Sequence, residues 1–139
     1  MKISILFVGK PRDPNANRMA EEFVGRSSHY ARIEMREVRP DRYDPFDRHP
    51  SAYKVALDPA GKLLDSAAFA ALIARAERED REFLFLVGGH DGLPRPWRDR
   101  ADLLLSLSPM TWPHELARVC LAEQIYRAFA TLRGHPYPR

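Results

Sequence analysis

The stretch FLFLVGGHDGL, residues 83–93, places three glycines directly after a run of five apolar residues. An uncharged run that ends at glycine is typical of a central parallel strand buried on both faces of a sheet. Open α/β sheets bind ligands beyond the carboxyl ends of such strands, and glycine lets a ligand approach the backbone closely. For an isolated glycine pair, a tight turn that needs positive φ is the more common reason. The spacing Gly-Gly-x-x-Gly differs from the dinucleotide fingerprint, and the lysine of a phosphate-binding P-loop is missing.

Apolar residues on both sides of this stretch alternate between strand and helix patterns. Short apolar or alternating runs predict four further strands, at residues 3–8, 33–38, 53–57 and 103–107. Helical spacing of apolar residues predicts three helices, which follow Asp13-Pro14, follow Asp65 or Ser66, and cover residues 115–133. Strands that alternate with helices predict an α/β fold with a mostly parallel sheet of about five strands flanked by helices.

Two segments between these elements carry loop and turn signals. Residues 39–51 contain three prolines among Asp, Arg and His, so we expect a surface loop with neither a regular helix nor a ladder strand. The sequence Asp58-Pro59-Ala60-Gly61 predicts a turn that ends the third strand.

The composition predicts one small domain. At 139 residues, 45% of them hydrophobic, the chain has enough apolar material for one core, so we expect residues 1–139 to form a single domain. The formal net charge of +3 permits a polyanionic partner without demanding one. The single Cys120 is interpreted as a small core residue, because it cannot form an intramolecular disulfide. The apolar run at residues 3–8 is too short for a secretory signal or a membrane span, so we expect a soluble, cytoplasmic protein without a membrane partner.

The last predicted helix carries apolar residues on more than one side. A helix that is apolar on most sides must be buried on most sides, and so short a chain has little material to cover it. We therefore expect a second copy of the chain to supply the remaining cover in a homodimer. Gly134 provides the signal that ends the helix.

A second distinctive stretch joins the predicted strand at residues 103–107 to this helix. It contains two prolines around Met-Thr-Trp and ends at His114-Glu115. Taken alone it fits a rigid connector, with His114 an ordinary residue of the first helical turn. Turns that follow two neighbouring strands would, however, form opposite walls of one crevice, which is where small-molecule sites lie.

Several motifs in fixed order carry a resemblance to a known family. They are residues 86–93, residues 105–114, Arg118-Val119, residues 123–129 and the tail His135-Pro136-Tyr137. Together they resemble the RlmH family of SPOUT methyltransferases, which methylate N3 of a pseudouridine in bacterial 23S ribosomal RNA. The match covers the C-terminal half and, more loosely, residues 1–10.

The resemblance implies a deep trefoil-knotted α/β fold, a homodimer that acts on assembled ribosomes, and a pocket for S-adenosylmethionine in the knot. The resemblance implies no bound metal. By motif match, the cofactor contacts fall on Leu57, Gly88, Gly89, Leu107, Ser108, Pro109, Met110, Thr111 and Trp112. Backbone groups of the turns would satisfy the adenine edge, and the leucines would supply apolar contact. On this basis we expect Gly88→Val to fill the ligand space while leaving the fold intact.

The reaction that the family implies requires alignment of the acceptor nitrogen and removal of its proton. Candidate catalytic residues are His135, Tyr137, Arg118 and His114, and the choice of proton acceptor stays open. For Arg118, and for Arg127 on the same helix, a surface ion pair is an equally good interpretation. The resemblance also implies that the tail lies beside the cofactor pocket, where it would position the nucleoside.

Two departures from the family pattern leave an alternative open. In the family we expect a helix and basic residues leading to it between the second and third strands, whereas residues 39–51 of this chain are interrupted by prolines. In addition, Pro138 stands where the family has a histidine after the tyrosine. A binding module that keeps the pocket but has lost catalysis is therefore the alternative function. A purely structural dimerisation protein would explain the long apolar helix but not the paired turns.

Overall fold

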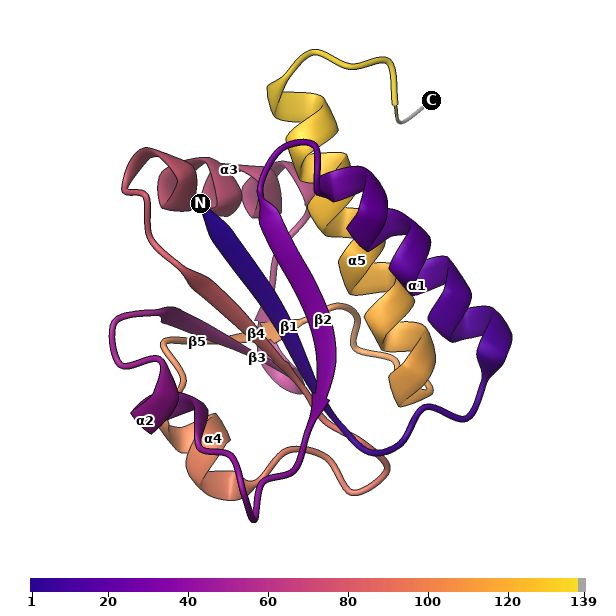
Figure 1. Cartoon of the computed structure of the whole chain (residues 1–139), viewed down its shortest axis with the longest axis vertical. Helices are drawn as coiled ribbons and strands as arrows, with labels where there is room; N and C mark the ends of the chain where they lie inside the picture. Colours follow the sequence, from indigo (N-terminus) through magenta and orange to yellow (C-terminus); the bar gives the residue numbers. More distant parts are fainter. Residues whose placement is uncertain (138–139) are drawn as a thin grey trace.

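The strand that ends in the glycine turn lies at the centre of a five-stranded sheet (Figure 1). In this computed structural model, residues 1–137 are described. The strands are β1 (Lys2–Val8), β2 (Arg32–Val38), β3 (Tyr53–Leu63), β4 (Phe83–Val87) and β5 (Leu103–Ser106). Their order is β2-β1-β4-β3-β5, and every pairing is parallel. All five β4 residues are buried, as expected for a central parallel strand. The predicted α/β class is confirmed.

Helices cover both faces of the sheet and create two apolar cores. On one face lie α1 (Pro14–Ser27), α3 (Ser66–Arg78) and α5 (His114–Leu132); on the other lie the short helices α2 (Pro45–Arg48) and α4 (Arg95–Arg100). Alternation along β4 sends Phe83 and Phe85 into the first core, and Leu84 and Leu86 into the second. The central strand therefore joins the two cores.

The predicted helix boundaries rest on caps that the structure confirms. The Asp13 side chain accepts hydrogen bonds from the backbone N–H groups of Asn15 and Ala16, and Pro14 occupies the first helical position. Asp65 caps α3 in the same way, at 2.7 Å from the backbone nitrogen of Ala68. At the other end of the chain, α5 stops before Gly134, whose φ is +69°.

The predicted turn at Asp58-Pro59-Ala60-Gly61 is wrong, because β3 continues through it to Leu63. Leu57 pairs with Leu105, and after an irregularity Lys62 pairs with Leu105 again. The residues between them bulge out of the ladder while the chain stays extended on both sides. Pairing with β5, which local sequence does not reveal, overrides the turn signal.

The expectation for residues 39–51 is wrong in part, because they contain the one-turn helix α2. Pro45 fits the first helical position, and the Asp44 side chain caps the turn through the backbone N–H of Phe46 at 2.9 Å. Tyr43 and Phe46 are buried in the second core. The segment is therefore a packed cover for the sheet. Helix α4 was not predicted, and its Trp97 enters the same core.

The helices within residues 1–137 lack the combination of length and apolarity that a membrane crossing requires. The strand pairings do not establish the trefoil knot, so the knot stays a prediction of the family resemblance.

The bulge in β3 predicts a sharp difference between two glycines. A Cβ on Gly61 would lie 2.6 Å from the backbone carbonyl carbon of Leu104, whereas a Cβ on Gly25 within α1 meets nothing within 4 Å. We expect Gly61→Ala to lower the free energy of unfolding by about 2 kcal/mol through overpacking. The control Gly25→Ala should raise it by about 0.5 kcal/mol, because alanine favours helix. Urea denaturation measures both; equal effects would contradict the close approach.

Candidate active site

A cleft of about 490 Å³ opens at the carboxyl edge of the sheet. One wall is the turn after β4, a second is the bulge of β3, and a third is the connection from β5 to α5. His114 and Ala117 of α5 complete the lining. The volume lies in the range of small-molecule sites.

The predicted cofactor contacts converge on this cleft. Its lining includes Leu57, Gly88, Gly89, Leu107, Ser108, Met110, Thr111 and Trp112; Pro109 is the predicted contact that the lining does not include. The strands behind the two predicted turns are not neighbours, however. Strand β3 lies between β4 and β5, so its bulge contributes a wall that the sequence did not suggest.

Local contacts fix the turns that form the walls. Ser106 donates a side-chain hydrogen bond to the backbone carbonyl of Ser108, and the Ser108 hydroxyl accepts the backbone N–H of Met110. In the glycine turn, a Cβ on Gly88 would lie 2.6 Å from the carbonyl carbon of Gly92. The expectation that Gly88→Val spares the fold is therefore wrong, because the side chain would meet backbone rather than ligand space.

The cleft also contains charged residues that sequence reasoning missed. Asp58 and Arg98 both line it, and their side chains form an ion pair at 3.2 Å. The second Asp58 oxygen accepts the backbone N–H of Ala60 at 2.8 Å, which fixes the bulge. Asp58 had been assigned to a turn, and α4, which carries Arg98, had not been predicted.

Arg118 lies in the protein interior, next to the cleft but outside its lining. Its side chain is 1% exposed and stacks on the Phe7 ring, with 3.7 Å between the guanidinium carbon and the ring centroid. Its Nη2 pairs with Glu115 at 3.1 Å, whereas Nε and Nη1 are buried with no hydrogen-bond acceptor in residues 1–137. The surface-pair interpretation of Arg118 is therefore wrong. Arg127, by contrast, does form a partly exposed pair with Glu123.

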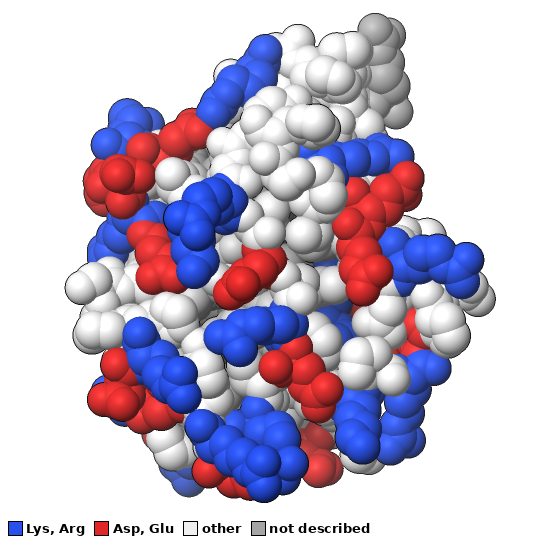
Figure 2. Space-filling model, in the orientation of Figure 1, with Lys and Arg blue, Asp and Glu red and all other residues white. Residues whose placement is uncertain are grey.

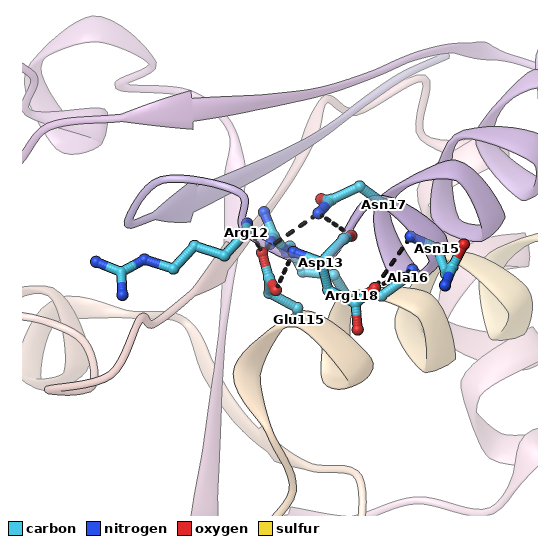
Figure 3. Close-up of polar contacts among 7 residues, drawn as sticks. All are labelled: Arg12, Asp13, Asn15, Ala16, Asn17, Glu115 and Arg118. Atoms are coloured by element: carbon cyan, nitrogen blue, oxygen red, sulfur yellow. Dashed lines mark hydrogen bonds and ion pairs between the residues drawn. The ribbon is translucent and has the colours of Figure 1, made fainter.

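Glu115 joins the start of α5 to the loop between β1 and α1 (Figure 3). Its carboxylate accepts the backbone N–H of Arg12 at 2.5 Å and that of Asp13 at 2.9 Å. The side-chain amide of Asn17 adds a third contact at 3.3 Å, and Arg118 adds the fourth. The contacts with Arg12, Asp13 and Asn17 span 98 to 103 residues of sequence, which is why no local pattern revealed them.

The tail folds back on α5. Tyr137 donates a hydrogen bond to Glu123 at 2.5 Å, and its ring packs against Tyr126 with 4.9 Å between the centroids. His135 follows the end of the helix. The lining of the cleft includes His114, at the start of α5, but neither His135 nor Tyr137. Within one chain, His114 is thus the predicted catalytic residue that reaches the cleft. Pro138 lies outside the described residues.

Comparison with known proteins identifies the family. The sequence profile described as predicted SPOUT methyltransferase matches residues 1–138. A protein of Solibacter usitatus named ribosomal RNA large subunit methyltransferase H is 63% identical over 139 residues, which cover all of both chains. The protein of the same name from Gemmatimonas aurantiaca is 37% identical, with 99% of each chain covered. The chain belongs to this methyltransferase family.

Solved structures show the same fold at low sequence identity. A probable methylase family protein from Haemophilus influenzae has a TM-score of 0.66 at 10% identity, covering 99% of this chain and 70% of its own. A probable methyltransferase from Bordetella pertussis has a TM-score of 0.62 at 13% identity, covering 91% and 93%. AviRb from Streptomyces viridochromogenes, in complex with AdoMet, has a TM-score of 0.52 at 13% identity, covering 92% and 58%. The SPOUT-type α/β architecture is therefore shared.

In this SPOUT methyltransferase, Glu115 has a lowered pKa. The main cause is the hydrogen bond from the backbone N–H of Arg12, which burial opposes. Further lowering comes from Asn17, Asp13 and the charge of Arg118.

The lowered pKa predicts a pH-dependent loss of stability. A carboxylate whose native pKa lies below the ordinary 4.5 contributes stability above that pH and loses it as the pH falls through the native pKa. We expect Glu115→Gln to cost about 3 kcal/mol at pH 7, because Arg118 keeps a buried charge without its counter-ion. The difference from the native chain should shrink as urea denaturation is repeated toward pH 3.

The matched control is Glu22→Gln, which removes an exposed pair with Arg26 on α1. It should cost less than about 0.5 kcal/mol at any of these pH values. A Glu115→Gln deficit that stays constant with pH would contradict the ionic role.

Proposed function

We propose that the protein binds S-adenosylmethionine in the cleft and transfers its methyl group to N3 of a pseudouridine in 23S ribosomal RNA. The observation that carries this proposal is the convergence of eight motif-matched residues from three separate segments on one cleft. The full-length relatives named ribosomal RNA large subunit methyltransferase H support the substrate class. AviRb, which has the same fold, binds AdoMet. We further propose that residues 1–139 act as one SPOUT domain, on assembled ribosomes in the cytoplasm.

The residues of the cleft fit this cofactor. Leu57, Leu105 and Leu107 offer apolar surface for a purine ring and a thioether chain. Glycines at the turn after β4 leave their backbone groups accessible to the polar edge of an adenine. When bound, adenosylmethionine would supply a methyl group already activated by its sulfonium.

The protein itself must position the acceptor nitrogen and provide a base for its proton. As the N3–C bond forms, the sulfur–methyl bond breaks, and the N3 proton must pass to a base. His114, which lines the cleft, is the proposed acceptor within the same chain. Arg118 is too deeply buried to contact the nucleoside, so we assign it to holding the start of α5 in place.

We also propose that the protein is a homodimer. Helices α1 and α3 of the same chain already cover part of α5. Exposed apolar side chains nevertheless remain on Met19, Trp112 and Leu116. Met19 and Trp112 border a largely apolar groove of about 620 Å³, which Val119 and Cys120 also line. A second copy seated on this surface would bury it and could bring its own His135 and Tyr137 to the cleft.

The dimer has a direct test. Light scattering at micromolar concentration should give about twice the chain mass of 16.0 kDa. Met19→Asp, which places a charge on an exposed apolar residue that lines the groove, should shift the mass toward the monomer. Leu63→Asp is the control, because Leu63 is also exposed but does not line the groove. A native chain that stays monomeric would remove the basis for a shared site.

The cofactor pocket is tested by a bulky substitution on α5, because a substitution in the glycine turn after β4 would disturb the fold. Ala117→Phe projects a ring from α5 into the cleft and should weaken adenosylmethionine binding at least about tenfold in calorimetry. Ala71→Phe on the exposed face of α3 is the control and should bind normally. Equal affinities for the two variants would contradict the pocket assignment.

Methyl transfer to ribosomes that lack the modification tests the reaction itself. The native protein should label 23S ribosomal RNA with methyl groups from adenosylmethionine, and Ala117→Phe should not. Binding of the cofactor without transfer would instead favour the catalytically impaired module, for which Pro138 in place of a histidine is the argument.

A further inference from the structure

The loop between β1 and α1, residues 9–13, is exposed but has a fixed backbone. The Glu115 carboxylate accepts the backbone N–H groups of Arg12 and Asp13. Pro11 within the loop and Pro14 directly after it restrict the φ angles further. The loop backbone is therefore held in place while the side chains of Lys10 and Arg12 stay exposed.

The carboxylates in and beside this loop are turned toward the protein. One Asp13 side-chain oxygen accepts the backbone N–H groups of Asn15 and Ala16 at 3.0 and 3.1 Å. Both oxygens of Glu115 accept backbone N–H groups of the loop, and one also pairs with Arg118. These negative charges are already engaged in holding the fold.

The cations of the loop have no such partners. Lys10 and Arg12 are exposed, and neither has a carboxylate within 4.0 Å among residues 1–137. Figure 3 shows the Arg12 side chain extending away from the cluster around Glu115. In Figure 2, basic side chains gather at the lower right of the molecule, where Figure 1 places the connection from β1 to α1. The loop thus presents positive charge to solvent.

The loop that carries this positive charge lies beside the cleft. A Cβ on Gly9 would be 3.8 Å from the Cα of Gly89, which lines the cleft. On the other side, His114 lines the cleft, and the next residue, Glu115, holds the loop. A polynucleotide whose nucleoside enters the cleft past this loop brings its flanking phosphates next to Lys10 and Arg12.

We propose that Lys10 and Arg12 form a phosphate-binding pair that contacts the RNA backbone next to the target nucleotide. This assignment rests on the proposed function, because it takes the polynucleotide to be ribosomal RNA. Cations without counter-ions supply the sequence-independent part of RNA affinity, and a loop backbone that is already fixed lowers the entropy lost on binding. The pair contacts the RNA backbone and takes no part in the chemistry.

The test compares two double variants that each remove two positive charges. Lys10→Gln/Arg12→Gln alters the loop. Arg32→Gln/Arg78→Gln alters two exposed residues at the first position of β2 and the last position of α3, at the opposite edge of the sheet. For each variant we would measure binding to ribosomes purified from cells that lack this methyltransferase, over a series of KCl concentrations. Adenosylmethionine affinity and the KM and kcat for ribosomes complete the comparison.

The loop variant should bind ribosomes about tenfold more weakly at moderate salt. The slope of log Kobs against log[KCl] should become shallower by about 1.5, near 0.7 to 0.9 for each lost phosphate contact. KM should rise with little change in kcat, because the lost contact is made equally in ground and transition states. Adenosylmethionine affinity should not change, and the control variant should behave like the native protein.

Three results would overturn the proposal. They are unchanged ribosome binding by the loop variant, an equal loss in both double variants, and a loss of adenosylmethionine affinity in the loop variant. The proposed function fails separately, if the native protein binds ribosomes with the expected salt dependence but transfers no methyl group. A native protein that does not bind ribosomes at all would overturn both.

Discussion

Direct packing of backbone against backbone at the carboxyl edge of the sheet is the constraint on which the cleft depends. Gly61 lies against the Leu104 carbonyl, and Gly88 lies against Gly92, at distances that leave no room for a Cβ. These approaches bring the β3 bulge next to β5 and tighten the turn after β4. Two walls of the cleft, the β3 bulge and the turn after β4, are therefore held in place by close packing of backbone.

One buried charge connects the cleft to the rest of the fold. Arg118 is held between the Phe7 ring and Glu115, and Glu115 in turn holds the loop after β1. Burial lowers the pKa of the Arg118 guanidinium, and the charge of Glu115 and its hydrogen bond oppose that effect. Such a pair contributes little net stability but is costly to break. The pair therefore ties the start of α5, which lines the cleft, to β1 and to the loop that follows it.

The second face of the sheet is covered with very little chain. Two short helices, α2 and α4, place Phe46 and Trp97 over β4 and its neighbours. The Arg100 guanidinium lies 4.3 Å from the centroid of the Phe46 ring, which shields the aromatic cover from solvent while keeping the surface polar. A proline-rich segment can therefore replace a longer helix, provided that its few apolar residues reach the core.

The sequence by itself determined the existence of the five strands and the three long helices, the caps at Asp13 and Asp65, the burial of β4 and the family to which the chain belongs. These features depend on local periodicity and on motifs whose order survives in a single chain. Only the tertiary structure decided that residues 58–61 stay extended beside β5, that β3 lies between β4 and β5, and that Arg118 is buried. It also decided that Glu115 holds the loop before α1, because its carboxylate accepts the backbone N–H of Arg12 across 103 residues of sequence. Contacts between distant segments leave no periodic trace in the sequence, and where they conflict with a local turn signal, the free energy of pairing and burial is larger.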